Sequence, residues 1–182
     1  MGGNLVLRAT AELAGSQILT GTIAVCPNID PAQCVDALEE PRNRIYHNHF
    51  LTSLKARLRR KDALFPEKWD LTGLDRIRTL REFDDRYTAP DGGYRDSVDY
   101  YDRAGARHVL ASLSVPTTIF TAQDDPFIPY PMFDLPDLRD NKWIRLIAPR
   151  YGGHCGFFQA RRGGEDRFWV ENRIVEVMQG RT

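Results

Sequence analysis

The sequence predicts an α/β fold, with a mostly parallel sheet of about three strands flanked by helices. Three short apolar runs have the composition of strands buried on both faces, and segments with helical periodicity separate these runs along the chain. The 182 residues suffice for one domain with a hydrophobic core, or for part of a larger domain.

The first two elements favour this fold class. A helix is expected from Asn4, whose side chain can cap it, to about Ala14, and Gly15 then ends the helix. The run "GTIAVCP" at residues 21–27 is predicted to form the first strand. A helix joined to a buried strand by a short link is typical of α/β proteins.

A long helical region is expected next. Residues 31–65 have a helical pattern, and residues 66–96 combine short helices with a turn at 91–93, so 31–96 is expected to form a lid or connecting region between strands. A further helix is predicted at 97–104. The apolar face expected in the first of these segments consists of Tyr46, Phe50, Leu51, Leu54 and Leu58.

Two more strands and a final helix complete the prediction. The strands are expected at Thr117–Ala122 and Trp143–Pro149. Gly180 is predicted to end the last helix. Ligands gather at the carboxyl ends of parallel strands, so candidate functional residues are sought there. The apolar stripe of the last helix is predicted to contain Val170, Ile174, Val177 and Met178.

Composition argues against some classes of partner. Lys and Arg together number 25, as do Asp and Glu, so no net charge attracts nucleic acid or an anionic membrane. The basic run at 55–61 is interpreted as the solvated face of a helix, and no nucleic-acid partner is expected. No long apolar segment or signal-peptide pattern occurs, which predicts a cytoplasmic location and leaves transient membrane contact open.

Histidines and cysteines give no metal motif. His47 and His49 lie two residues apart, a spacing that does not align two ligands on one helical face. The three cysteines, Cys26, Cys34 and Cys155, lack CxxC or zinc-ligand spacing and are interpreted as buried or bystander thiols. The sequence therefore predicts neither a metal nor a cofactor.

Asp125 and His154 are the candidate catalytic residues. Asp125 precedes Pro126, which keeps it out of the α region at the exit of the second strand. Gly152 and Gly153 allow a backbone path that brings His154 over the strand tips. A carboxylate and an imidazole on consecutive strand ends can form a charge-oriented base, although this pair lacks a nucleophile.

The opening stretch "MGGN" indicates where that nucleophile is expected. A nucleophile elbow has the pattern G-x-S-x-G, and its partners follow in the order Ser, Asp, His. If Gly2 is the last glycine of that pattern, Met1 is the residue after the serine. The serine is then expected immediately before Met1.

Three motifs resemble one hydrolase family. "GGNLVLR", "VPTTIFTAQDDPFIP" and "GGHCGFF" resemble the C-terminal half of the YheT-like (AB-hydrolase-4) branch of the α/β-hydrolases. The segment "YTAPDGGYRDSVDYYDRAGA" is also similar to the family's segment before the strand that leads to the acid. The resemblance implies that residues 1–182 form one partial α/β-hydrolase domain that begins just after the nucleophile serine.

The resemblance also implies an activity and roles for individual residues. The activity is that of a serine hydrolase of carboxylic esters, either short-chain or lipid esters, without a cofactor. Asp125 is the implied triad acid and His154 the implied base, while the neighbouring Asp124 is left out. Met1 and Gly2 are implied to lie at the elbow, with the backbone N–H of Met1 as an oxyanion donor.

Two expectations follow for the chain by itself, and there are two alternatives. Lacking the serine, it should be inactive, and an open edge on its first strand should favour self-association. The alternative function is that of a non-catalytic hydrolase-fold remnant, acting as an interaction or regulatory module. A thiol nucleophile at Cys155 is disfavoured, because neighbouring side chains at a sharp turn often diverge.

Overall fold

Three short parallel strands form the sheet of this protein. A computed structural model describes residues 2–161 and 163–180. The strands β1 (Thr22–Val25), β2 (Thr117–Phe120) and β3 (Ile144–Ile147) lie in the order β1-β2-β3, and both pairings are parallel. The predicted α/β fold with a parallel sheet of three strands is thus confirmed.

Backbone pairing continues past the strand ends toward the carboxyl edge of the sheet. The N–H of Cys26 donates to the carbonyl of Phe120 at 2.7 Å, and the N–H of Gln123 donates to the carbonyl of Pro149 at 3.0 Å. The apolar runs that predicted strands up to Ala122 and Pro149 therefore include residues that stay extended beyond the regular ladder. These extensions hold the loops after all three strands at one edge.

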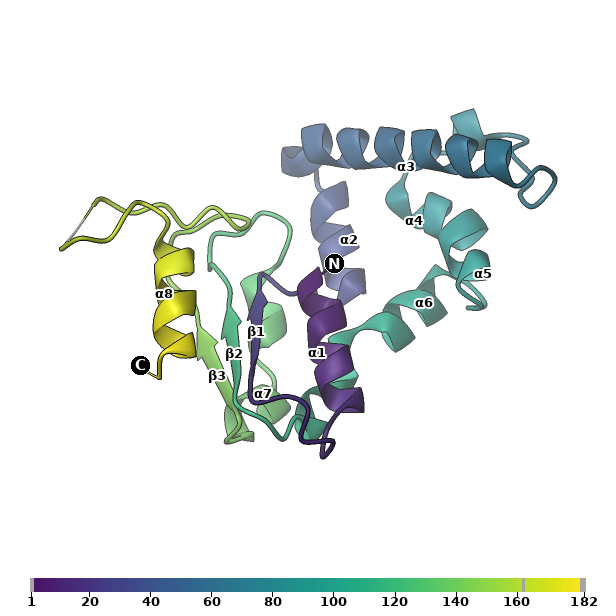
Figure 1. Cartoon of the computed structure of the whole chain (residues 1–182). Helices are drawn as coiled ribbons and strands as arrows, with labels where there is room; N and C mark the ends of the chain where they lie inside the picture. Colours follow the sequence, from purple (N-terminus) through teal and green to yellow (C-terminus); the bar gives the residue numbers. More distant parts are fainter. Residues whose placement is uncertain (1, 162, 181–182) are drawn as a thin grey trace.

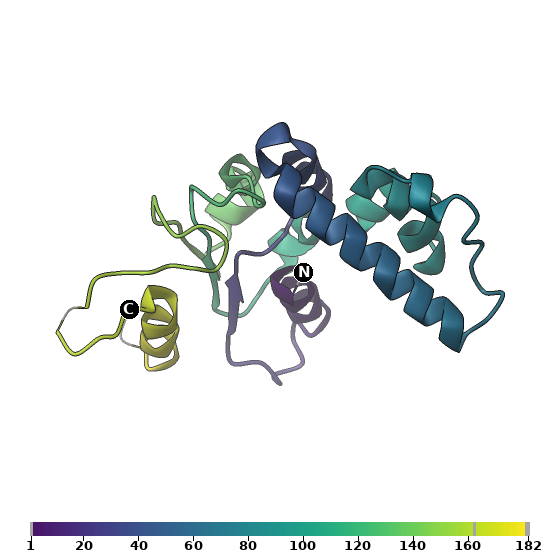
Figure 2. The ribbon, with the colours of Figure 1, turned by 90° about the horizontal axis from the view of Figure 1, so that it is seen from above.

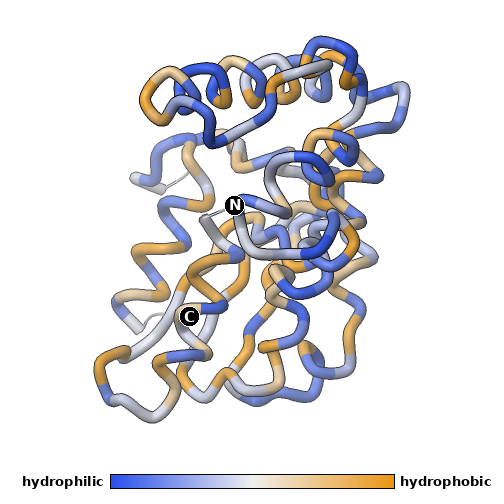
Figure 3. Tube along the Cα trace, turned by 90° about the vertical axis from the view of Figure 1, so that its right-hand side faces the viewer, coloured by the Kyte–Doolittle hydropathy of each residue, from blue (hydrophilic) through white to orange (hydrophobic). Residues whose placement is uncertain are grey.

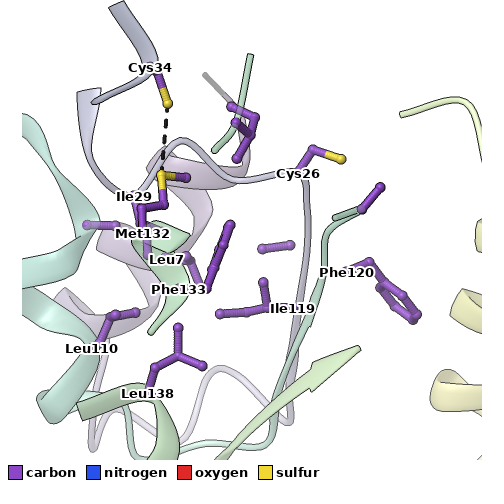
Figure 4. Close-up of a cluster of buried hydrophobic side chains, with 14 of the residues drawn as sticks. Leu7, Cys26, Ile29, Cys34, Leu110, Ile119, Phe120, Met132, Phe133 and Leu138 are labelled. Atoms are coloured by element: carbon purple, nitrogen blue, oxygen red, sulfur yellow. Dashed lines mark hydrogen bonds between the residues drawn. The ribbon is translucent and has the colours of Figure 1, made fainter. Parts of the chain in front are cut away.

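Helices cover both faces of the sheet. Figure 1 shows α1 (Gly2–Glu12) on one side and α8 (Trp169–Met178) on the other. All of β2 is buried between these layers. In Figure 4, Ile119 points toward Leu110, whereas Phe120 points the opposite way. On that second face the ring of Phe120 meets Trp169 of α8, with the ring centroids 6.0 Å apart.

The start of α1 differs from the prediction. The helix begins at Gly2, so Asn4 lies within it and is not its cap. Asn4 is 8% exposed, its Nδ2 donates to the carbonyl of Ala104 at 2.9 Å, and its Oδ1 accepts from the N–H of Ala106 at 2.8 Å. The amide thus joins α1 to a chain segment about a hundred residues away. Such a distant partner leaves no local pattern in the sequence.

We expect Asn4→Ala to lower the free energy of unfolding by about 1–3 kcal/mol, because it leaves the buried N–H of Ala106 without its acceptor. Urea denaturation of the chain measures this loss. Ser16→Ala is the control, since the Ser16 hydroxyl makes its hydrogen bond at the exposed surface and the expected change is below about 0.5 kcal/mol. Equal effects of the two substitutions would contradict the bridging role of Asn4.

The region after β1 is helical, as predicted. Asp30 caps α2 by accepting from the N–H of Gln33, and Pro41 opens the short 3-10 turn that separates α2 from α3. The helix predicted at 97–104 is α6 with those bounds. The helices of this part are α2 (Pro31–Glu39), α3 (Arg44–Leu64), α4 (Leu80–Phe83), the π-helical η3 (Asp84–Thr88), α5 (Ala89–Asp91) and α6 (Ser97–Ala104).

Shorter helical segments also occur in the connections from β1 to β2 and from β2 to β3. They are the 3-10 segments η1 (Pro41–Asn43), η2 (Leu74–Arg76), η4 (Ala106–Ser112) and η5 (Tyr130–Phe133), and the helix α7 (Pro136–Asp140). The turn predicted at 91–93 overlaps the last residue of α5, and Gly93 in it has a positive φ of 76°. In Figure 2 the helices α3 to α5 project away from the side of the sheet that carries α8.

The helical region from α2 to α6 has a hydrophobic core of its own. Its buried residues are Val35, Leu51, Leu58, Leu74, Ile77, Leu80, Phe83, Tyr87 and Tyr101. Two basic residues of α3 have partners in this region: Lys55 donates to the carbonyl of Ile77, and Arg59 forms an exposed ion pair with Asp75. These contacts give those two members of the basic run a structural role.

Burial is uneven along the two predicted apolar faces. Tyr46 and Phe50 are 48% and 41% exposed, and α3, at the top of Figure 3, mixes hydrophilic and hydrophobic residues along its trace. Met178 is 77% exposed and is not part of the buried stripe of α8, although Val170 is buried. Helical periodicity predicts which residues share a face, but only the packing decides which part of that face is covered. Among the described helices, none has the length and apolar character that crossing a membrane requires.

Candidate active site

Asp125 is held at the exit of β2 by the backbone that follows it. Its Oδ1 accepts from the N–H groups of Phe127 at 2.9 Å and Ile128 at 3.0 Å, and its side chain is fully buried. Pro126 between them has no N–H, so the carboxylate folds forward onto the next two amides as in an Asx turn. This local geometry fixes the orientation of the carboxylate.

The second oxygen of Asp125 contacts His154. Nδ1 of His154 lies 2.9 Å from Oδ2, and the imidazole is 38% exposed. Burial alone would raise the pKa of Asp125, but the hydrogen bonds from His154 and the two backbone amides outweigh it and lower the pKa. The carboxylate is therefore ionised at neutral pH and accepts a hydrogen bond from the N–H at Nδ1 of His154.

This arrangement leaves Nε2 of His154 with a free lone pair. The neutral imidazole has one N–H donor and one acceptor nitrogen, and Asp125 engages the donor. Nε2 can therefore take up a proton, and the neighbouring carboxylate stabilises the resulting imidazolium. The structure thus brings together the two residues that the sequence singled out 29 positions apart.

Asp124 also contributes to the site, although sequence analysis left it out. Its Oδ1 accepts from the N–H groups of Gly152 at 2.9 Å and Gly153 at 2.8 Å. The two adjacent aspartates therefore have different partners. Asp125 forms a hydrogen bond with the side chain of His154, and Asp124 accepts hydrogen bonds from the backbone just before that residue. The sequence contained a signal for this, since two glycines provide free N–H groups in the loop that precedes His154.

Gly152 has no room for a side chain. A Cβ atom there would lie 2.5 Å from Cδ1 of Phe157 and 2.9 Å from Cβ of Ala122. Phe157 is buried and stacks on Trp169, with centroids 5.8 Å apart, and its N–H donates to the carbonyl of Gly152. Neither neighbour can move freely, so the glycine lets the histidine loop pass close to β2.

We expect Gly152→Ala to lower the free energy of unfolding by about 1–3 kcal/mol, because the added methyl group overpacks this contact. It should also weaken the bond between Asp125 and His154, seen as loss of the downfield imidazole N–H signal in the NMR spectrum. Gly2→Ala is the control, because open space surrounds its Cβ position. An unchanged imidazole signal in Gly152→Ala would contradict the proposed role of the close approach.

Aromatic rings from the helical region reach this site. The ring of Phe127 lies 5.1 Å from the His154 ring between centroids, and Tyr46 of α3 packs edge-on against Phe127 at 4.6 Å. Phe50 lies 6.2 Å from Phe127. The partly exposed face of α3 is thus directed toward the catalytic candidates. The pattern of α3 alone predicted only that these apolar residues share a face.

The candidate elbow residues are partly outside the described structure. Met1 lies outside the described residues, and Gly2 is exposed at the first position of α1. A Cβ on Gly3 would lie 2.9 Å from Cα of Pro27, so the start of α1 packs closely on the loop after β1. The N-terminus of α1 is therefore at the carboxyl edge of the sheet (Figure 1). Asp125 and His154 follow β2 and β3 at this same edge.

Two cysteines share this edge with His154. Sγ of Cys26, Sγ of Cys155 and a ring nitrogen of His154 all lie within 4.8 Å of one another. Cys26 is buried, which raises the pKa of its thiol, whereas Cys155 is exposed. Among residues 2–161 and 163–180, this is the one group of His, Cys, Asp or Glu whose atoms could hold a metal, and His47 and His49 are not in it.

Comparison with known proteins finds several hydrolase relatives. Phospholipase ABHD3 from Mus musculus is 30% identical over 160 residues, which are 87% of this chain and 39% of that protein. The putative esterase YheT from Escherichia coli is 31% identical over 181 residues, covering 97% of this chain and 52% of that protein. Monoacylglycerol lipase from Saccharomyces cerevisiae is 34% identical over 108 residues, covering 58% of this chain and 23% of that protein.

Two further comparisons complete this picture. No family model matches the chain. An alpha/beta fold family hydrolase from Bacillus anthracis has a solved structure that is 15% identical, with a TM-score of 0.49, covering 98% of this chain and 63% of that one. The chain spans about half the length, or less, of the three hydrolase relatives. Its match to YheT extends over nearly its whole length, and by sequence the chain is a homologue of the α/β-hydrolase family members YheT and ABHD3.

Proposed function

We propose that this chain supplies the acid and the base of a serine hydrolase that acts on carboxylic esters. The observation that supports this most directly is the 2.9 Å contact between Nδ1 of His154 and the fully buried carboxylate of Asp125. In this proposal His154 is the general base and Asp125 orients it. Relatives that are named esterase, phospholipase and lipase support ester hydrolysis.

The proposed reaction is acyl transfer in two steps. Nε2 of His154 takes the proton of the serine hydroxyl as its oxygen attacks the ester carbonyl, and then gives that proton to the leaving alcohol. A water molecule, deprotonated by the same nitrogen, then attacks the acyl-enzyme, and the bond to the serine oxygen breaks as Nε2 returns the proton to that oxygen and the carboxylic acid leaves. Asp125 stays ionised throughout and stabilises the imidazolium that forms in each step.

The serine of this proposal precedes Met1 in the native protein. In a G-x-S-x-G elbow, Gly2 would be the last glycine and the N–H of Met1 an oxyanion donor. The start of α1 at the carboxyl edge of the sheet supports this position, and the greater length of the relatives leaves room for the preceding strands. We therefore expect residues 1–182 alone to have no esterase activity.

The proposed substrates have an apolar acyl group. Phe127, Tyr46 and Phe50 form an aromatic surface that begins 5.1 Å from the His154 ring. An acyl chain bound against these rings would place its ester carbonyl near Nε2 of His154. In this proposal the helical region at 31–96 acts as a lid that lines the acyl site.

Intact-mass measurement and N-terminal sequencing of the native protein test the proposal, together with labelling by a fluorophosphonate probe. We expect a longer species with G-x-S directly before "MGGN", labelled on that serine. A native chain that starts at Met1, or one that reacts with no such probe, would overturn the hydrolase proposal. The alternative of a non-catalytic interaction module would then be preferred.

Light scattering tests a consequence for residues 1–182 alone. Within the described residues β1 pairs only with β2, so its other edge presents unpaired backbone groups. We expect the isolated chain to self-associate through this edge. A monodisperse monomer that melts cooperatively would contradict this expectation.

A further inference from the structure

Cys26, His154 and Cys155 form a cluster that the proposed hydrolase mechanism does not use in full. Cys26 directly follows β1, and its backbone N–H pairs with the carbonyl of Phe120 of β2, so its position is set by the sheet. Cys155 follows His154 in the loop between β3 and α8. Two loops far apart in the sequence thus bring two thiols to one imidazole.

Both cysteines have an unusual backbone conformation. Cys26 has a φ of 42° and Cys155 a φ of 62°, in the left-handed region that residues other than glycine seldom adopt. In Figure 4 the sulfur of Cys26 points away from the core residues Leu7 and Ile29. The third cysteine, Cys34, instead has its sulfur 4.0 Å from Sδ of Met132.

The dimensions of the cluster fit a tetrahedral zinc ion. The three candidate ligand atoms lie within 4.8 Å of one another. Zinc bonds of about 2.3 Å to sulfur and about 2.0 Å to nitrogen place tetrahedral ligand atoms about 3.4–3.8 Å apart. Side-chain shifts of about 1 Å are enough to close this difference.

From this geometry we propose that Cys26, Cys155 and His154 bind a zinc ion, with the fourth position open to solvent. Two thiolates and one imidazole are a ligand set that zinc uses when it keeps an open position. Cys155 and His154 are exposed and provide the access path, while the buried Cys26 forms the floor of the site.

His154 is already oriented for this role. Its Nδ1 is engaged by Asp125, so Nε2 is the nitrogen that binds the ion. A carboxylate on the second ring nitrogen is the usual support of a zinc-binding histidine, because it fixes the tautomer and the ring orientation. Zinc at Nε2 and a proton at Nε2 exclude each other, so a bound ion would inhibit any general-base function of His154.

Titration of the metal-free chain with zinc chloride, in the presence of a reductant that does not bind zinc and a chromophoric competing chelator, tests this proposal. We expect one zinc ion per chain. Cys155→Ser and Cys26→Ser should each weaken binding more than about 10-fold, since even residues that only support a ligand contribute this much. Cys34→Ser is the matched control and should bind zinc as the unaltered chain does.

Cobalt substitution provides a second measurement. Bound Co²⁺ should give a thiolate-to-metal charge-transfer band that weakens in Cys155→Ser and in Cys26→Ser but not in Cys34→Ser. Because Cys155 is exposed, its replacement leaves the fold intact even if Cys26→Ser unfolds the chain. Absence of zinc binding by the reduced chain, or zinc binding that Cys155→Ser leaves unchanged, would overturn the proposal.

Discussion

Asp125→Asn should lower the turnover of the proposed serine hydrolase by about 10⁴-fold. The asparagine amide can donate to Nδ1 of His154, which stabilises the tautomer that carries its proton on Nε2. That tautomer cannot accept the proton of the serine. The side chain keeps nearly the same shape, and its oxygen can still accept from the N–H groups of Phe127 and Ile128. The loss is therefore in catalysis and not in the fold.

The adjacent Asp124→Asn is the matched control. Its side-chain oxygen can still accept from the N–H groups of Gly152 and Gly153, so the histidine loop keeps its path. We expect turnover to fall by less than about 10-fold, because a neutral acceptor replaces a charged one in hydrogen bonds that only position the loop. Steady-state kinetics with a short-chain ester measures both variants of the complete protein. Equal losses in kcat would overturn the assignment of Asp125 as the acid.

Phe120→Ala should lower the free energy of unfolding by about 3–5 kcal/mol. Phe120 ends the central strand, is fully buried, and packs its ring against Trp169 of α8. Its removal leaves a cavity between the sheet and α8 that surrounding backbone cannot easily fill. This loss is a large part of the total stability of about 5–15 kcal/mol that a domain has, so the variant should be near the threshold of unfolding.

Phe158→Ala is the control for this substitution. Phe158 is 70% exposed, and its ring lies beside that of Phe168, with ring centroids 5.6 Å apart. The same change of residue type should therefore cost less than about 1 kcal/mol. Urea denaturation of the two variants under identical conditions separates the values. A loss of similar size in both would mean that α8 does not cover β2 in solution.

Local pattern was enough to predict the three strands and several of the helices around them. The run "TTIF" at 117–120 is apolar at successive positions because β2 is buried on both faces, and such a run needs no knowledge of its neighbours. The helix at 97–104 has Asp96 before it as a cap, and its bounds were predicted correctly. Asp125 and His154 could be selected because strand exits and a Gly-Gly turn are visible in the sequence.

Only the tertiary structure decided which distant residues meet. It made Asn4 a bridge to Ala104 and Ala106 in place of a helix cap, and it brought Cys26 beside Cys155. A cap, a strand and a turn depend on residues within a few positions, so the sequence by itself determines them. Contacts between residues about a hundred positions apart depend on how the layers pack, and no local period encodes that packing.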